Sequence, residues 1–487
     1  MSGLAARHGG RAGLAALVAV LLLGLGLRLG EAWDGRPPVY DAAAYAAIAA
    51  NLDEGNGFTV GPRATQPSTN YSPGLPLFVA GLYEATGGVH ERLARVVLAV
   101  VGTLSVLFTY LLGRRLTRVV VRPSPHRPGS GEVGAATGAA GADFWPALLG
   151  ALAVAIFPAL LEYQGMLMSE PLAATLLSGS VLAVLWARER EGPLAWLLPG
   201  ALLGALSLTR PEYLAVSVLI AVLVALPGFR SLFVALCATN SERKDWRPAL
   251  ARAGVLLGAL AVVLAPWTVR NAVALERFVP VSTGGGQVLF AGTYLPSGGD
   301  PERVGAEVVA RHPELFAPDA TEKLRLEQIL ARLAAHRYPG TETDQALSKM
   351  GKEQLWDDIG EAPLEYAGFL AKKVGRVWFH PARNVMRAPA WRILQWALVL
   401  LGLLGLAVLA WRRRWEALLL GAILLAITGI SALLVASPRR VLVLLPLVAA
   451  LAGVGLAWSA RAVRPARTPS RQGRDPDRPR SQRSEAV

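Results

Sequence analysis

Long apolar runs recur along this chain, and they limit what it can fold into. Ten stretches of roughly 15 to 25 residues carry almost no charge, and each can cross the ~30 Å hydrocarbon core of a bilayer as a helix. These stretches are residues 14–29, 93–112, 145–161, 171–187, 194–208, 214–227, 255–267, 393–411, 417–436 and 441–458. The sequence therefore predicts an all-α polytopic membrane protein with about ten transmembrane helices and additional exterior helices beside the membrane.

The charged segments between these runs predict the orientation. The chain has 49 Lys and Arg against 35 Asp and Glu, a net charge of +14. The basic residues collect in alternate loops and in the C-terminal tail, as the positive-inside rule expects of cytoplasmic segments, so topology rather than nucleic-acid binding explains them. These segments are residues 114–127, 188–190, 230–252, 412–414 and 461–487. The first run could also be a signal peptide, but Arg28, Leu29 and Gly30 form a poor cleavage site, which favours an uncleaved anchor.

This topology divides the chain into six parts. They are residues 1–112 with the first span, an exterior loop and the second span; a basic cytoplasmic linker at 113–145; a transmembrane core at 146–267; an exterior helical loop at 268–390; the last spans at 391–460; and a disordered basic cytoplasmic tail at 461–487. Helical patterning is present at residues 344–359 and 363–378, and a flexible Gly- and Ala-rich stretch at 129–141.

Residues 73–83 are apolar and leave two alternatives open. They could form one more span, or a piece that lies on the membrane surface or re-enters it. An additional span would move every later basic loop to the exterior and break the charge asymmetry. The sequence therefore favours the surface or re-entrant piece.

The stretch at residues 39–58 presents a carboxylate just after the first span. Asp41, Tyr45, Ile48 and Leu52 share one face of a helix, which the glycines at 55 and 57 bring to an end. We expect a short amphipathic helix along the membrane surface. Asp41 could simply be a helix N-cap, or it could be a general base that takes a proton from an acceptor. Tyr45 could line the same pocket or belong to an interfacial aromatic belt.

Other polar residues are predicted at the same exterior face. Glu170 precedes Pro171 at the start of a span, where it could bind an acceptor or a divalent ion, or only favour the helix start. Arg439 and Arg440 also fall outside, against the positive-inside tendency. Guanidinium groups suit bidentate phosphate binding, whereas arginines at an interface can also simply extend toward water.

Three further residues are candidates for the exterior site. Arg210, Arg270 and Asn271 each follow or close an apolar run at this face. The glycine-rich stretch at 280–294 lacks the strand and helix of a nucleotide-binding loop. Cys237 is the only cysteine, and no His/Cys cluster occurs, so the sequence suggests neither a disulfide nor a bound nucleotide or zinc cofactor. A divalent cation at the two carboxylates is the one cofactor that remains open.

Taken in order, these segments resemble the GT-C class of membrane glycosyltransferases, in particular the bacterial relatives of the dolichyl-phosphate-mannose protein mannosyltransferases and the lipid A aminoarabinose transferases. The resemblance covers roughly residues 14–460. It is carried by YDAAAYAAIAANLDEGNGF, NYSPGLPLF, MSEPL, LTRPEY, PWTVRNAVALERFVPVSTGGG and SPRRVLVLLP. Many relatives carry a second acidic residue directly after the first-loop aspartate, where this chain has Ala42. The C-terminal exterior domain of the protein mannosyltransferases is not found in the sequence either.

The resemblance implies an inverting transferase in the cytoplasmic membrane with its active site outside. It implies that Asp41 is the base, Glu170 a second acidic pocket residue, and that Arg270, Arg439 and Arg210 lie near the phosphate. The donor would be a polyprenyl-phosphate sugar, and the acceptor a lipid, glycan or protein. A transporter or lipid flippase is the main rival, but such proteins place ionisable residues near the bilayer midplane, whereas here they collect at the rim. A polymerase using a lipid-diphosphate donor is the rival among enzymes.

Overall fold

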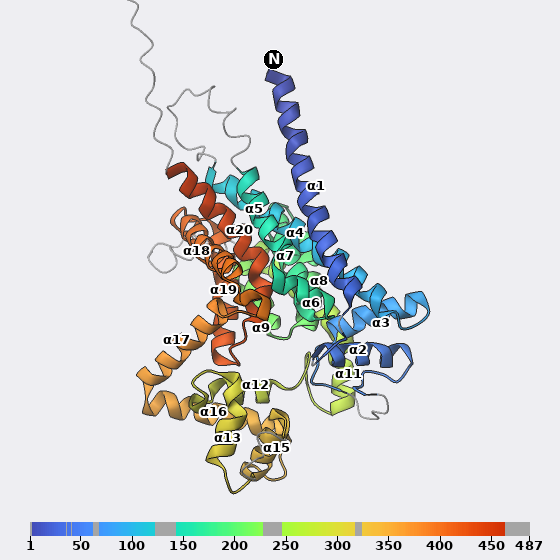
Figure 1. The fold of residues 1–487 in the computed structure, drawn as a ribbon, viewed down its shortest axis with the longest axis vertical. Helices are drawn as coiled ribbons and strands as arrows, with labels where there is room; N and C mark the ends of the chain where they lie inside the picture. The colour runs from blue at the N-terminus through green and yellow to red at the C-terminus, as the bar shows by residue number, and fades with distance from the viewer. Residues whose placement is uncertain are drawn as a thin grey trace, which may run out of the picture.

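The computed structural model describes residues 2–35, 37–39, 41–61, 68–121, 143–226, 246–316 and 324–462. Every regular element within these ranges is a helix (Figure 1). The predicted linker at 129–141 and the tail from residue 463 onward lie outside them, as does most of the predicted basic loop at 230–252. The prediction of an all-α protein is confirmed.

Seven of the described helices are long and apolar enough to cross a membrane. An eighth crossing results if the bent pair α5 (Phe144–Ala155) and α6 (Pro158–Gly165) counts as one span. The seven are α1 (Ser2–Asp34), α4 (Glu91–Val121), α7 (Ser169–Arg188), α11 (Arg247–Leu275), α18 (Pro389–Trp411), α19 (Trp415–Leu433) and α20 (Arg439–Ala462). The polytopic architecture expected from the apolar runs is thus confirmed.

Two of the ten predicted spans are shorter than expected. Residues 194–208 fall in η1 (Pro193–Trp196) and α8 (Leu197–Thr209), and residues 214–225 of the run 214–227 fall in α9 (Glu212–Ala225). At 1.5 Å per residue, the 14 residues of α9 reach about 21 Å, which is less than the ~30 Å hydrocarbon core. All ten apolar runs therefore form helices, but α8 and α9 are too short to cross a bilayer by themselves.

The bend between α5 and α6 explains a buried arginine in the first span. The two helices meet at 44°, at a break that ends with Pro158 as the first residue of α6. The break leaves carbonyls at the end of α5 without helical partners. Arg28 of α1 is 2% exposed and donates to the carbonyls of Val154 and Ala155, each at 3.2 Å. A cation at a helix C-terminus is also favoured by the helix dipole.

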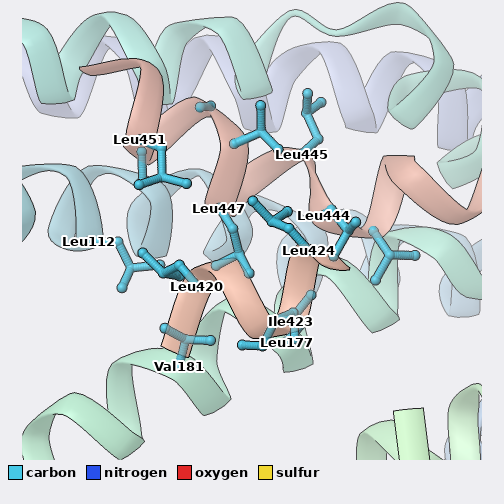
Figure 2. Packing of buried hydrophobic residues seen from close by; sticks show 14 of the residues in the cluster. Leu112, Leu177, Val181, Leu420, Ile423, Leu424, Leu444, Leu445, Leu447 and Leu451 are labelled. Atoms are coloured by element: carbon cyan, nitrogen blue, oxygen red, sulfur yellow. The ribbon is translucent and has the colours of Figure 1, made fainter. Parts of the chain in front are cut away.

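Helices α7 and α20 form the centre of the bundle. In their most apolar stretches 83% and 89% of the residues are buried, against 17% in α1. Figure 2 shows Leu447 of α20 among side chains of three other helices, including Leu112 of α4, Leu177 of α7 and Leu420 of α19. Two helices held on all sides in this way give fixed positions to the residues at their ends.

Small residues allow α20 to approach α18 closely. A Cβ atom added at Gly405 would lie 2.0 Å from the carbonyl oxygen of Leu451, and one at Gly455 would lie 2.3 Å from that of Leu401. Neither contact could be relieved by turning a side chain, because each involves backbone. Glycine is therefore required at both positions, as is typical where transmembrane helices pack closely.

A second group of helices gathers beyond one end of the bundle (Figure 1). It has its own apolar core, which includes Phe290, Val308 and Leu330. Its helices are α12 (Gly285–Thr293), α13 (Val304–Arg311), α15 (Leu326–Arg337), α16 (Thr343–Glu361) and α17 (Pro363–Phe379), with the short helices η2 (Leu295–Ser297) and η3 (Pro301–Arg303). The helical patterning at 344–359 and 363–378 is confirmed. Helix η4 (Asn384–Arg387) leads back to α18.

The two short helices of the first loop refine the predictions made for them. Helix α2 (Asp41–Asp53) begins and ends where expected, but its buried residues, among them Ala42, Ala44 and Ile48, lie all around its axis. The expectation of an amphipathic helix is therefore wrong, because α2 is enclosed by protein. Helix α3 (Gly74–Thr86) has 13 residues and reaches about 20 Å, which excludes a full crossing and leaves the surface or re-entrant piece that the sequence favoured.

Candidate functional site

Three helices begin at one place, and each contributes a charged residue from its first turn. Asp41 begins α2, Glu170 is the second residue of α7, and Arg439 begins α20. An acidic residue is favoured at a helix N-terminus by the helix dipole, whereas an arginine is not. The carboxylates that surround Arg439 supply the negative charge that compensates for this unfavourable position.

Arg439 joins the two predicted carboxylates. Its Nη1 lies 3.0 Å from Oδ2 of Asp41, and its Nε lies 2.8 Å from Oε1 of Glu170. The partners are 398 and 269 positions away in the sequence. One planar guanidinium thus fixes the separation and the orientation of two carboxylates from different helices.

Arg210, which follows α8, continues the chain of ion pairs. Its Nη1 lies 3.2 Å from the same Oε1 of Glu170, and its Nε lies 2.8 Å from Oε1 of Glu212. Arg440 approaches Glu212 from the other side, with 3.9 Å between its Nε and Oε1. Glu212 was not predicted from the sequence, although it lies only two residues beyond Arg210 in the quoted segment LTRPEY.

We call these six residues the charge network. It contains three carboxylates and three guanidinium groups, and its members are Asp41, Glu170, Arg210, Glu212, Arg439 and Arg440. The side chain of Glu170 is 0% exposed, whereas that of Asp41 is 40% exposed. Oε2 of Glu170 has no hydrogen-bond partner within the described residues. Asp41 is therefore the accessible carboxylate, and Glu170 is the buried anchor of the network.

The network borders a cavity of about 330 Å³ that contains both charged and apolar surfaces. Its lining comprises Asp41, Tyr45, Ser72, Ser169, Thr209, Arg210, Pro211, Glu212, Val288, Val435, Ser437, Arg439 and Arg440. Five of the eight predicted site residues thus lie around one cavity, and Glu170 lies directly behind it. Val288 belongs to α12, so the exterior group of helices closes part of this cavity.

Tyr45 contributes a neutral hydroxyl to the cavity. Burial raises the pKa of its phenol above the ordinary value, and the carboxylates of Asp41 and Glu170 add to the increase. Tyr45 therefore stays protonated at neutral pH and can donate a hydrogen bond. Its ring also packs edge-on against Tyr71, with 5.8 Å between the ring centroids. Of the two carboxylates that line this cavity, Asp41 is the more exposed, at 40% against 14% for Glu212, so Asp41 is the better placed to accept a proton from a substrate.

Arg270 and Asn271 lie outside the cavity lining. Nη1 of Arg270 donates to the carbonyl of Ser68 at 3.2 Å, and its guanidinium lies over the ring of Trp267. Asn271 is fully buried, and its Nδ2 donates to the carbonyl of Val281 at 2.9 Å. These contacts hold the first exterior loop and the loop after α11 against the end of α11. A contact of Arg270 or Asn271 with substrate stays a prediction.

The arrangement of the carboxylates bears on the possible divalent cation. The described residues contain no group of three His, Cys, Asp or Glu side chains that could hold a metal ion. Arg439 lies between Asp41 and Glu170, so a cation bridging these two would have to displace its guanidinium. A divalent cation at this site therefore stays a prediction.

At the level of sequence, no protein-family model and no curated protein matches this chain. The similarity lies in the structure. The oligosaccharyltransferase of Archaeoglobus fulgidus tethered with an acceptor peptide containing the NVT sequon aligns at 14% identity and a TM-score of 0.52, covering 92% of this chain and 50% of that one. The same organism's AglB, in complex with an inhibitory peptide and a dolichol-phosphate, aligns at 16% identity and a TM-score of 0.50, covering 94% and 52%.

ArnT from Cupriavidus metallidurans bound to undecaprenyl phosphate aligns at 14% identity and a TM-score of 0.37, covering 92% of this chain and 78% of that one. This chain spans about half the length of the oligosaccharyltransferases. At such low identity the agreement concerns the arrangement of helices. In its fold, the chain is similar to the archaeal oligosaccharyltransferases described above.

Proposed function

We propose that this protein is an inverting glycosyltransferase that moves a sugar from a polyprenyl-phosphate donor to an acceptor on the exterior face of the cytoplasmic membrane. One observation carries the proposal: the accessible carboxylate of Asp41 borders the same cavity as the guanidinium of Arg439, only 3.0 Å away. A proton acceptor and a phosphate-binding cation are thus adjacent, which is what such a transfer needs.

Asp41 would act as the general base. Its carboxylate takes the proton from the acceptor's hydroxyl or amine as that atom attacks the anomeric carbon of the sugar. The new bond forms as the bond from that carbon to the phosphate oxygen breaks, and the bonding electrons leave with the lipid phosphate. Attack opposite the leaving group inverts the configuration. Since the phosphate leaves as a stabilised anion, no general acid is required.

The arginines of the network would bind the phosphate. Arg439 and Arg440 both line the cavity, and their guanidinium groups can donate to phosphate oxygens as negative charge develops there. The two carboxylate contacts of Arg439 fix its orientation before substrate enters, so little reorganisation is needed during the reaction. The archaeal AglB of similar fold was solved with a dolichol-phosphate, which supports a polyprenyl-phosphate ligand.

The experiment that tests this function compares wild type with Asp41→Asn. Membranes containing each protein receive a panel of radiolabelled polyprenyl-phosphate sugars, and transfer to endogenous lipid, glycan and protein is measured. Removal of a general base lowers transfer by about 10²- to 10⁴-fold. Asp53→Asn is the matched control, because it makes the same change at the other end of α2, outside the cavity lining.

Loss of transfer in Asp41→Asn alone, with equal protein in the membrane, supports the proposed base. Equal transfer by Asp41→Asn and wild type contradicts it. Transfer by none of the three proteins across the donor panel favours the rival transporter or flippase function. Translocation of the labelled lipid in vesicles is then the decisive measurement.

A further inference from the structure

A second charged cavity lies at the opposite end of the bundle, and nothing in the proposed transfer uses it. Its volume is about 440 Å³, and six charged residues line it: Arg114, Arg115, Arg118, Glu189, Arg414 and Glu416. We call it the basic cavity, because four arginines face two glutamates. Its side chains come from α4, from the end of α7, from the turn between α18 and α19 and from the first turn of α19.

Helix α7 gives the distance between the two cavities. Glu170 is at its start and Glu189 caps its end, so about 19 residues at 1.5 Å place them about 28 Å apart. This distance matches the ~30 Å hydrocarbon core of a bilayer. Figure 1 shows the C-terminal end of α20 on the side of the bundle away from α12–α16. The basic cavity therefore lies at the membrane–water boundary opposite the charge network.

Exposed tryptophans mark the same boundary. Trp186 lies one turn before Glu189 and is 39% exposed, and Trp411 lies just before Arg414 and is 75% exposed. Tryptophan is enriched at the headgroup level of bilayers, where its ring is partly apolar and its N–H is hydrated. Leu111, which is 41% exposed, lines the cavity on its apolar side. The cavity therefore joins a polar, basic part to a surface suited to acyl chains.

The arginines of this cavity are oriented but not fully used. Asp143 accepts from Nε of Arg118 at 2.6 Å and from Nε of Arg114 at 3.3 Å. Each guanidinium carries five N–H donors, so contact through Nε fixes its plane and leaves terminal N–H groups for another acceptor. In Arg114 one of these, on Nη1, donates to the hydroxyl of Tyr110 at 3.1 Å. The Arg118 and Arg414 side chains remain 46% and 44% exposed. Positioned and accessible guanidinium groups are what a phosphate needs.

We propose that the basic cavity binds the phosphodiester headgroup of an anionic phospholipid from the cytoplasmic leaflet. Two properties favour such a lipid over a zwitterionic one. The lining has a net positive charge, and an anionic headgroup has no choline cation that the arginines would repel. Basic pockets between transmembrane helices on the cytoplasmic side are typical sites for such headgroups. The proposal concerns another site and does not depend on the proposed transfer.

The test measures lipid binding by native mass spectrometry of the full-length protein in detergent. Phosphatidylglycerol and phosphatidylcholine of equal chain length are titrated separately. For the double variant Arg118→Gln/Arg414→Gln we expect phosphatidylglycerol binding to weaken about tenfold or more, because two basic residues near the headgroup are lost. Each of these arginines is the more exposed residue of its ion pair, and Asp143 keeps Arg114 as a partner. We therefore expect the double variant to fold.

The matched control is Arg190→Gln/Arg412→Gln. It removes the same charge from the same membrane face, and neither residue lines the cavity. The proposal predicts less than about threefold weakening in the control and weak phosphatidylcholine binding to every protein. Equal weakening in both double variants would overturn the proposal in favour of general surface attraction. Equal binding of the two lipids by wild type would also overturn it.

A competition experiment distinguishes binding of a lipid headgroup from binding of a soluble phosphate. Inorganic phosphate or glycerol phosphate in excess should displace phosphatidylglycerol only weakly, because neither has acyl chains to contact the apolar side of the cavity. Full displacement by either would assign the cavity to a soluble anion and overturn the lipid proposal. Asp41→Asn should bind the lipid as wild type does, so failure here and failure of the proposed transfer give different results.

Discussion

The charge network and the basic cavity contain the same types of side chain, arginines and carboxylates, but differ in how deeply these are buried. Each places arginines beside a carboxylate at one end of α7, the network at its start and the basic cavity at its end. Glu170 in the network is 0% exposed and shares one oxygen between two arginines, whereas Glu189 at the cavity is 66% exposed and meets Arg115 at 2.7 Å. These contacts are similar in length, so the distance between the charged atoms does not by itself show how rigid an ion pair is or how much it stabilises the protein.

Burial decides what each pair can do. A buried pair is costly to form, because both charges lose water, but it is rigid, and removing one partner leaves an uncompensated charge. An exposed pair is screened by water and salt and contributes ~0–1 kcal/mol. The network therefore suits a preorganised reaction site. The basic cavity, with accessible cations, suits a ligand that arrives from the membrane surface.

The largest expected effect is on stability in Glu170→Gln. The substitution leaves Arg439 and Arg210 close together with one carboxylate fewer between them. We expect the free energy of unfolding to fall by about 3 kcal/mol, at the low end for a broken buried pair, because each arginine keeps a second carboxylate. Thermal unfolding in detergent measures it. A change no larger than that of Glu189→Gln would break the comparison.

Arg439→Lys tests the orienting role of the guanidinium. Lysine keeps the charge but cannot contact Asp41 and Glu170 through two fixed nitrogens. We expect transfer to fall about 10²-fold, as on loss of one preorganised donor. Arg383→Lys is the control, because Arg383 is equally exposed, at 31%, and pairs with Glu162 at 2.6 Å outside the cavity lining. Similar losses in both variants would argue against a special role for Arg439.

Lys373 of α17 extends the comparison to a buried cation that donates to a carbonyl rather than to a carboxylate. It is 1% exposed, its Nζ donates to the carbonyl of Gly292 in α12, and it lies 5.0 Å from the ring centroid of Phe369. Burial lowers the pKa of Lys373 to about 7, and nearby Arg440 adds to the decrease. Above that pH the folded protein carries this amine mostly uncharged.

The sign of the pH dependence follows from proton binding. In the unfolded chain the pKa of Lys373 is about 10.4, so between pH 7 and that value the unfolded chain binds more protons. This residue therefore makes the protein more stable as pH rises, by about 2 kcal/mol from pH 7 to about pH 9. Unfolding measured against pH should lose this slope in Lys373→Met and keep it in Lys372→Met, the exposed neighbour. An unchanged slope in Lys373→Met would refute the assignment.

Much of this arrangement is visible in the sequence, for a physical reason. Apolar runs of membrane length predict helices directly, because a chain that crosses a bilayer must satisfy its backbone hydrogen bonds internally, as a helix does. The positive-inside rule then assigns each helix end to a face, which groups Asp41, Glu170 and Arg439 although they are far apart in sequence. Topology therefore predicted that these residues share a face, and the structure brings them into contact.

Contacts within that face were not predictable. The role of Glu212 depends on the turn between α8 and α9, and that of Arg28 depends on the break between α5 and α6, which no apolar pattern reveals. The enclosure of α2 was missed because alanines allow close packing on any side, so periodicity could not show which faces were covered. Burial of Lys373 likewise depends on how α17 packs against α12. Each of these is set by tertiary packing and not by local pattern.

The smallest expected effect is that of Glu189→Gln, and it sets the scale for the others. The carboxylate is 66% exposed, and its partner Arg115 also donates to the carbonyl of Leu185 at 2.9 Å, so Arg115 keeps its position without it. We expect less than ~1 kcal/mol in the free energy of unfolding, and less still in high salt. Thermal unfolding with and without salt measures both. Because the substitution also makes the basic cavity more positive, phosphatidylglycerol should bind slightly more tightly, whereas a loss of binding would mean that Glu189 orients Arg115 for the headgroup.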